Sequence, residues 1–225
     1  MKKTLLCGVL LLMAIATNAQ FMRAKELEKY AKEKYGDKWV EASANLLQSE
    51  NLQLDKNNSL TYTQVIDCGE KTKEQLYILL NYWVSNSFND ANSVIQLNDK
   101  DAGVIICQGY VSGIAANVGG MNAYVVSIKP IIKLDIKDKK IRVTYTVQYY
   151  DIERSNGVLT ASSYGNPVTK QKWALEKTYP FVPKDSHKKT SSKALVMTHA
   201  YSNVIMDKIE EAVKNGIVGN EGDDW

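Results

Sequence analysis

The chain has 225 residues with a formal net charge of +3 at pH 7, and 44% of its residues are hydrophobic. This length suits one domain of ordinary size with an additional helical segment. Two of the cations, Lys2 and Lys3, lie in a segment that we expect to be removed, so the remaining chain is close to neutral. A nearly neutral surface lacks the strong basic field of a dedicated nucleic-acid-binding protein, and we predict no nucleic acid as a partner.

The first residues have the organisation of a secretory signal peptide. A short positive head precedes an apolar run over residues 4–15, and the small residues Thr17 and Ala19 occupy the two positions that signal peptidase reads. We predict a signal peptide over residues 1–19 and a periplasmic or cell-surface location for the exported protein. No second long apolar run follows, so no transmembrane segment is expected after removal of the signal.

Two short helices are expected next. Residues 22–35 have helical spacing, and Gly36 provides a C-terminal stop. Asp37 is suited to cap a second short helix. We interpret residues 20–54 as an N-terminal helical appendage, followed by a turn-rich joint at Asp55–Ser59.

The predicted core domain covers residues 55–216 and begins with a strand and a helix. Leu60–Ile66 is rich in β-branched and aromatic residues, and Gly69 interrupts this pattern. Thr72 and Gln75 have the spacing of a capping box at the start of the helix. The helix then presents one apolar stripe, formed by Leu76, Leu79, Leu80 and Trp83.

The following segment is less regular. We expect residues 89–101 to be a mostly polar connection and Val104–Cys107 to be a short buried strand. Asp99–Gly103 resembles part of a calcium loop but lacks the further oxygen ligands, so it is interpreted as a turn. Gly109–Gly120 lacks the ending of a phosphate loop and fits a flexible connection between strands, with a binding loop as the alternative.

The clearest pattern in the chain is a long antiparallel hairpin. Asp138 and Lys139 form its turn, and Pro130 predicts that its first strand lies at an edge or is bulged there. Apolar side chains alternate with mostly polar ones, so one face is expected to be buried and the other to meet water. The predicted apolar face comprises Tyr124, Val126, Ile128, Ile132, Leu134, Ile136, Ile141, Val143, Tyr145, Val147 and Tyr149. A second hairpin signal at Asn156-Gly157 suggests a short strand around Val158–Thr160.

The chain ends in another helix. Residues 162–190 show no regular pattern, Ser191 or Ser192 is suited to cap the helix, and Gly216 ends it before an acidic tail at 217–225. One face of this helix is formed by Leu195, His199, Ser202, Met206, Ile209 and Val213. The order of strand, helix, three or four strands and helix predicts a two-layer α+β domain, with a curved antiparallel sheet covered on one face by both helices.

Three segments of the chain resemble segments of a known family and follow one another in the same order as in that family. They are Leu76–Trp83, Phe88–Ile95 and Asp99–Ile105. Over residues 60–152 the sequence resembles a family of exported bacterial proteins of unknown function with a TATA-box-binding-protein-like domain. The resemblance implies a β-α-β-β-β-β-α topology and brings no catalytic residues. It does not imply DNA binding, because function resides in sites rather than in folds.

Cysteine and histidine residues offer few combinations for chemistry. Cys68 and Cys107 are either a disulfide of the exported protein or two buried apolar residues. Cys107 with His187 or His199 would supply a nucleophile and a base, but the apolar neighbours of Cys107 favour burial. No close spacing among these residues supports a zinc site, and we expect neither metal nor cofactor.

The polar face of the hairpin is the candidate binding surface. We predict that Lys129, Arg142, Gln148 and Tyr150 form an adaptable, partly aromatic surface that binds a protein or glycan of the cell envelope. An ordinary solvated sheet face is the alternative.

The leading functional hypothesis is a non-enzymatic envelope protein that serves as a binding or assembly module. It rests on the export signal and on the lack of a convergent catalytic set in the sequence. One alternative is a hydrolase of envelope polymers whose Asp, Glu or Tyr site residues the sequence does not single out. Another is a purely structural partner in a larger complex.

Overall fold

A computed structural model gives the three-dimensional structure of the protein. The residues that it describes are 22–49, 52–88, 94–118, 122–156 and 168–216. The predicted signal peptide at 1–19, the predicted strand Val158–Thr160 and the predicted tail at 217–225 lie outside the described residues.

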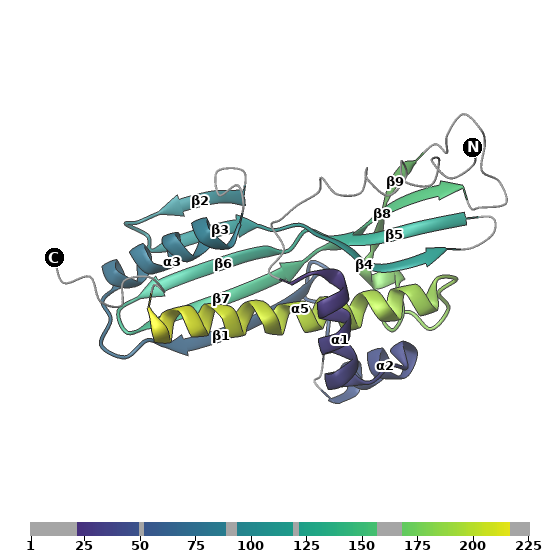
Figure 1. Ribbon diagram of the computed structural model, residues 1–225, viewed down its shortest axis with the longest axis horizontal. Coiled ribbons are helices and arrows are strands. Elements are labelled where there is room, and N and C mark those ends of the chain that lie inside the picture. The colour runs from purple at the N-terminus through teal and green to yellow at the C-terminus, as the bar shows by residue number, and fades with distance from the viewer. Residues whose placement is uncertain (1–21, 50–51, 89–93, 119–121, 157–167, 217–225) are drawn as a thin grey trace, which may run out of the picture.

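The described residues form nine strands in two antiparallel sheets that continue into one another (Figure 1). Sheet A has the order β1-β7-β6-β3-β2, and sheet B has the order β4-β5-β8-β9. Because β3 leads into β4, β5 into β6 and β7 into β8, the sheets are two halves of one long, bent surface. The bounds are β1 Leu60–Asp67, β2 Ile95–Asp99, β3 Val104–Gln108, β4 Val111–Val118, β5 Asn122–Ile128, β6 Ile131–Lys137, β7 Lys140–Val147, β8 Tyr149–Asn156 and β9 Thr169–Ala174.

Short interruptions separate β3 from β4, β5 from β6 and β7 from β8, and these interruptions lie side by side. The interruptions fall at Gly109, Pro130 and Gln148, and the Gly109 amide donates to the Pro130 carbonyl oxygen over 2.8 Å. Proline has no N–H group to donate to the ladder, which explains the break between β5 and β6. The predicted interruption at Pro130 is thus confirmed, but the edge-strand option is wrong because β6 pairs with both β3 and β7.

The interruption at Gln148 reverses which residues face the interior. Val147 is buried at the end of β7, and the next buried side chain on this strand is Tyr150, three residues later. A single irregular residue moves every following side chain to the opposite face of a strand. The prediction that Tyr150 lies on the polar face is therefore wrong, since Tyr150 is completely buried, and Tyr149 is only partly buried.

Two strands occur where connections were predicted. β2 lies within the polar segment, and β4 occupies most of the glycine-rich stretch, where Gly113 has φ +67° and the pairing with β5 shifts register. The prediction of a flexible connection at Gly109–Gly120 is wrong for the described part of that stretch. The polar segment does end in the predicted turn, in which the Ala102 amide donates to Asp99 Oδ1 over 2.8 Å.

The helices are α1 Ala24–Tyr35, α2 Trp39–Ser49, α3 Lys73–Ser87, the short 3₁₀ helix η2 Leu175–Lys177, and α5 Lys188–Asn215. The predicted capping box of α3 is confirmed, because the Gln75 amide donates to Thr72 Oγ1 while the Thr72 amide donates to Gln75 Oε1. Gly36 and Gly216 end α1 and α5 as predicted. Within the described parts of the chain, no helix is both long and apolar enough to cross a membrane.

The start of α5 differs from the prediction. The helix begins at Lys188, and Asp185 rather than a serine organises its first turn by accepting hydrogen bonds from the His187 amide and the Ser191 hydroxyl. Burial opposes ionisation of Asp185, but these hydrogen bonds and one from the Tyr179 amide outweigh it and lower the pKa of the carboxyl.

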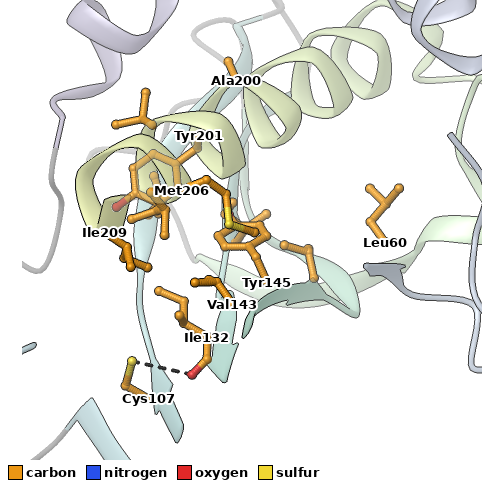
Figure 2. Close-up of a cluster of buried hydrophobic side chains, with 14 of the residues drawn as sticks. Leu60, Cys107, Ile132, Val143, Tyr145, Ala200, Tyr201, Met206 and Ile209 are labelled. Carbon is orange, nitrogen blue, oxygen red and sulfur yellow. Dashed lines mark hydrogen bonds between the residues drawn. The ribbon is translucent and has the colours of Figure 1, made fainter. Parts of the chain in front are cut away.

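The core lies between the inner face of the bent surface and the helices α3 and α5 (Figure 1). Figure 2 shows Val143, Tyr145 and Ile132 from the strands beside Tyr201, Met206 and Ile209 from α5. The inner face was predicted correctly except at Tyr149 and at Tyr124, which is partly buried. The two-layer α+β arrangement is therefore confirmed.

The two N-terminal helices dock on α5. Leu27 and Ala31 of α1 and Leu46 of α2 are buried. Lys193 Nζ of α5 lies 2.7 Å from Glu28 Oε2, and Asn203 Nδ2 donates to the Tyr35 hydroxyl over 2.7 Å. The first half of α5 is consequently enclosed on nearly all sides, by α1 and α2 on one side and the sheet on the other.

The change of face at Gln148 predicts unequal losses of stability for substitutions of two adjacent tyrosines. Tyr150→Ala should lower the free energy of unfolding by about 3 kcal/mol, because it opens a cavity in the core. Tyr149→Ala removes a half-buried ring that packs beneath Lys172, and it should cost less than about 1 kcal/mol. Urea unfolding followed by circular dichroism measures both values, and equal losses would show that the strand does not change face.

The buried groups also predict a loss of stability in alkali. Burial raises the pKa of the Cys107 thiol to about 12 and holds the pKa values of Tyr145 and Tyr150 above their ordinary range. The unfolded chain releases these protons at lower pH than the folded chain, so the stability present at neutral pH declines as the pH rises above about 9. Urea midpoints between pH 7 and pH 11 measure the decline.

Tyr145→Phe provides the matched variant. The Tyr145 hydroxyl makes no hydrogen bond to the described residues, so its removal should cost little at pH 7 and should flatten the decline above about pH 10. A decline identical to that of the wild-type protein would refute the assignment to this tyrosine.

Candidate binding surface

The outer face is the side of both sheets that points away from α3 and α5. In sheet A the strand registers place Val65, Arg142 and Asp135 in one row across β1, β7 and β6. Val65 is 62% exposed in the middle of a strand, whereas its inner-face neighbour Ile66 is buried. Strand alternation therefore gives the outer face its polar and charged side chains, with scattered exposed aliphatic ones.

Arg142 is held in place by a carboxylate on the neighbouring strand. Its Nε and Nη2 atoms donate to Asp135 Oδ2 over 3.0 and 2.9 Å, and Lys133 Nζ lies 2.7 Å from Asp135 Oδ1. Partial burial would raise the pKa of Asp135, but the hydrogen bonds and charges of Lys133 and Arg142 lower it. The single negative charge in this row is thus balanced by two positive ones.

A hollow of about 200 Å³ lies beside this row, and we call it the Arg142 hollow. Neither Lys137 nor Lys140 in its wall forms an ion pair with a described acidic residue. The hollow therefore has an excess of positive charge around an exposed aliphatic side chain. Its lining residues are Val65, Asp135, Lys137, Lys140, Ile141 and Arg142.

A second hollow, of about 250 Å³, lies on the outer face where the sheets meet, and we call it the Lys129 hollow. Lys129 Nζ lies 3.3 Å from Asp151 Oδ2, and Lys170 Nζ lies 3.6 Å from Glu153 Oε1. Tyr110 is 41% exposed, with Lys129 Nζ 6.0 Å from its ring centroid. The lining residues are Tyr110, Ser127, Lys129, Asp151, Ile152, Glu153 and Lys170.

The structure separates the four residues predicted from the sequence. Lys129 and Arg142 both lie on the outer face but in different hollows, and the exposed Gln148 lies at the junction between β7 and β8. Tyr150 lies in the core and is excluded from any exposed surface. The predicted set is therefore not one cluster.

Sequence reasoning missed Tyr110, Asp151 and Glu153. The predicted alternation runs through Gln148 without a break, and it therefore places the wrong residues of β8 on the outer face. The apolar Ile152 between the acidic Asp151 and Glu153 is the signal in the sequence that indicates the change. Tyr110 was assigned to a flexible connection, although it lies at the bend between two strands.

The cysteines do not form a nucleophilic site. Both are free and buried, and β1 and β3 are separated by β7 and β6, so Cys68 and Cys107 are not bridged. Cys107 Sγ donates to the Ile132 carbonyl oxygen over 3.6 Å (Figure 2). Burial raises the pKa of both thiols, which disfavours the reactive thiolate.

The histidines are engaged in ring packing. His187 stacks on Trp173 with 4.4 Å between ring centroids, and the buried His199 packs against Tyr35 and Tyr62. His187 Nδ1 faces both Ser186 Oγ and Asp185 Oδ1, whereas a catalytic triad needs the two partners on opposite ring nitrogens. In the part of the chain that the structure describes, no group of three or more His, Cys, Asp or Glu residues is placed to hold a metal ion.

Comparisons with known proteins give a family match and likenesses to solved structures. Residues 62–151 match a domain of unknown function (DUF4468) with a TBP-like fold. A crystal structure of a TBP-like protein from Parabacteroides distasonis is 13% identical, with a TM-score of 0.48 over 72% of this chain and 96% of that chain. A DUF4468 family protein from Bacteroides ovatus is also 13% identical, with a TM-score of 0.45 over 71% of this chain and 88% of that chain. No functionally curated protein matches.

The resemblance that Leu76–Trp83 and the two following segments suggested is thus confirmed. Residues 62–151 match the DUF4468 family, a family of unknown function with a TBP-like fold.

Proposed function

We propose that the protein is an exported, non-enzymatic binding module of the cell envelope, and that it binds an acidic glycan across the outer face. The observation that carries this proposal is the Arg142 hollow, where cations outnumber carboxylates around the exposed Val65. Export is proposed from the signal-like segment at residues 1–19.

The charge distribution favours an acidic ligand. Asp135 is already balanced by Lys133 and Arg142, so the positive charges of Lys137 and Lys140 remain to attract an anion. These groups are exposed or half-buried, and their effect on association should weaken as salt is added.

The chemistry of the face favours a glycan over a protein. Between the two hollows, β6 and β7 present Lys133, Thr144 and Thr146, whose ammonium and hydroxyl groups form hydrogen bonds readily with sugar hydroxyls. Protein interfaces instead have a core of aromatic and apolar residues from which charge is depleted. A charged row at the centre of the face does not provide such a core.

Polygalacturonate, an acidic polysaccharide, tests this proposal against neutral dextran. The wild-type protein should bind polygalacturonate more tightly than dextran, with a dissociation constant that rises with salt. Lys140→Glu/Arg142→Glu should weaken binding about tenfold, which corresponds to about 1.4 kcal/mol. Isothermal titration calorimetry measures the constants.

Lys29→Glu is the matched control, because Lys29 is an exposed lysine on α1, outside the candidate surface. It should leave binding nearly unchanged. An absence of binding to polygalacturonate, or an equal loss in the control, would contradict the proposal. Binding of an envelope protein instead of the polysaccharide would show that the partner is a protein, and it would contradict the glycan proposal.

Export has its own test. Expression of the full chain in a bacterium should yield a periplasmic or surface protein that begins at Gln20, because Ala19 supplies the small residue before the cleavage site. Ala19→Arg should leave the uncleaved precursor. N-terminal sequencing and cell fractionation distinguish these outcomes, and an uncleaved wild-type protein in the cytoplasm would refute the assignment.

A further inference from the structure

We infer that the Lys129 hollow is a subsite for one neutral sugar ring, which stacks on Tyr110 while its hydroxyls bond to Asp151 and Glu153. This inference rests on the proposed function, because it assigns a second contact to the same glycan. It differs in chemistry, since the Arg142 hollow recognises charge and the Lys129 hollow recognises a ring with hydroxyl groups.

The hollow is close to electrically neutral. Lys129 lies beside Asp151 and Lys170 lies beside Glu153, so two positive and two negative groups balance. A strongly anionic group would meet the two carboxylates, and a cation would meet the two ammonium groups. A neutral ligand is therefore favoured over either.

The alternation of donors and acceptors matches hydroxyl groups. Carboxylates only accept hydrogen bonds and ammonium groups only donate them, whereas a hydroxyl does both. Asp151 and Glu153 project from the same face of β8, two residues apart, and Lys170 pairs with Glu153 across β8 and β9. Neighbouring hydroxyls on a sugar ring can bridge such acceptor and donor pairs in turn.

Tyr110 provides the apolar contact that a sugar ring needs. It is one of the exposed aromatic residues of the described chain, and it lies at the bend between β3 and β4, at the edge of the hollow. An aromatic ring that is left open to water in this position covers the C–H face of a sugar at little entropic cost, because tyrosine has few rotatable bonds. The volume of the hollow, about 250 Å³, is the scale of a single ring.

The spacing of the hollows points to a polymer. Arg142 and Asp151 are nine residues apart along β7 and β8, so at about 3.3 Å per residue the two hollows are separated by at most roughly 30 Å. A single sugar reaches one hollow only. A chain of sugars that spans this distance contacts both hollows, and its affinity rises because the second contact forms within the same complex.

Two polyanions separate recognition of the ring from recognition of charge. Hyaluronate alternates acidic sugar rings with neutral ones, and polyglutamate carries carboxylates without sugar. Tyr110→Ala should weaken binding of hyaluronate five- to tenfold and leave binding of polyglutamate unchanged, while Tyr110→Phe should retain both. Tyr82→Ala, which removes a tyrosine of α3 with 43% exposure compared with 41% for Tyr110, is the matched control and should change neither.

Each outcome of this titration has a definite meaning. Equal losses for both polyanions in Tyr110→Ala, or no loss for either, would overturn the sugar subsite while the charge-based function stands. A wild-type protein that binds neither polyanion would overturn the proposed function and this inference together. Loss of binding in Tyr110→Phe as well would show that the hydroxyl group, rather than the ring, makes the contact.

Discussion

Burial of the inner face of the bent sheet beneath α5 is the constraint on which the rest of the structure depends. α5 has 28 residues, so it is about 42 Å long, and it contacts strands of both sheets. Tyr145 in sheet A and Tyr150 in sheet B both reach this helix region, through Tyr201 and Thr198 respectively. Each fully buried aromatic or large aliphatic side chain contributes about 1.5–3 kcal/mol of burial free energy, so the cover of α5 contributes to the stability of both sheets.

The same constraint explains the aligned interruptions of the long strands. A strand surface that follows one long helix must bend where sheet A gives way to sheet B, and the bends at Gly109, Pro130 and Gln148 lie next to one another. Gly109 packs against the Pro130 ring, where a Cβ atom would lie 3.4 Å from Pro130 Cγ. The bend on β7 and β8 also restores burial of apolar side chains, because the change of face at Gln148 brings Tyr150 and Ile152 inward.

The outer face is shaped by what the inner face requires. With the apolar residues committed to the core, the opposite positions carry Lys, Arg, Asp, Glu and Thr side chains that remain in contact with water. The bend creates the Lys129 hollow beside Tyr110, whereas the hairpin end of sheet A collects the cations of the Arg142 hollow. The two hollows, which we propose to recognise charge and a sugar ring, thus lie on one continuous surface.

The sequence alone determined the features that depend on neighbouring residues. It specified the capping box at Thr72, the helix stops at Gly36 and Gly216, and the inner face from Val126 to Val147, because each follows from local geometry or from a period of two. Tertiary structure decided the change of face at Gln148, the formation of strands β2 and β4 and the start of α5 at Lys188. The change of face depends on partner strands that are distant in the chain, since β7 pairs with β1 and β8 with β5. The α5 helix loses its one-sided apolar pattern because α1, α2 and the sheet enclose it. The candidate surface was therefore predictable at Lys129 and Arg142, whereas Tyr110, Asp151 and Glu153 emerged only once the bend had turned them to the same side.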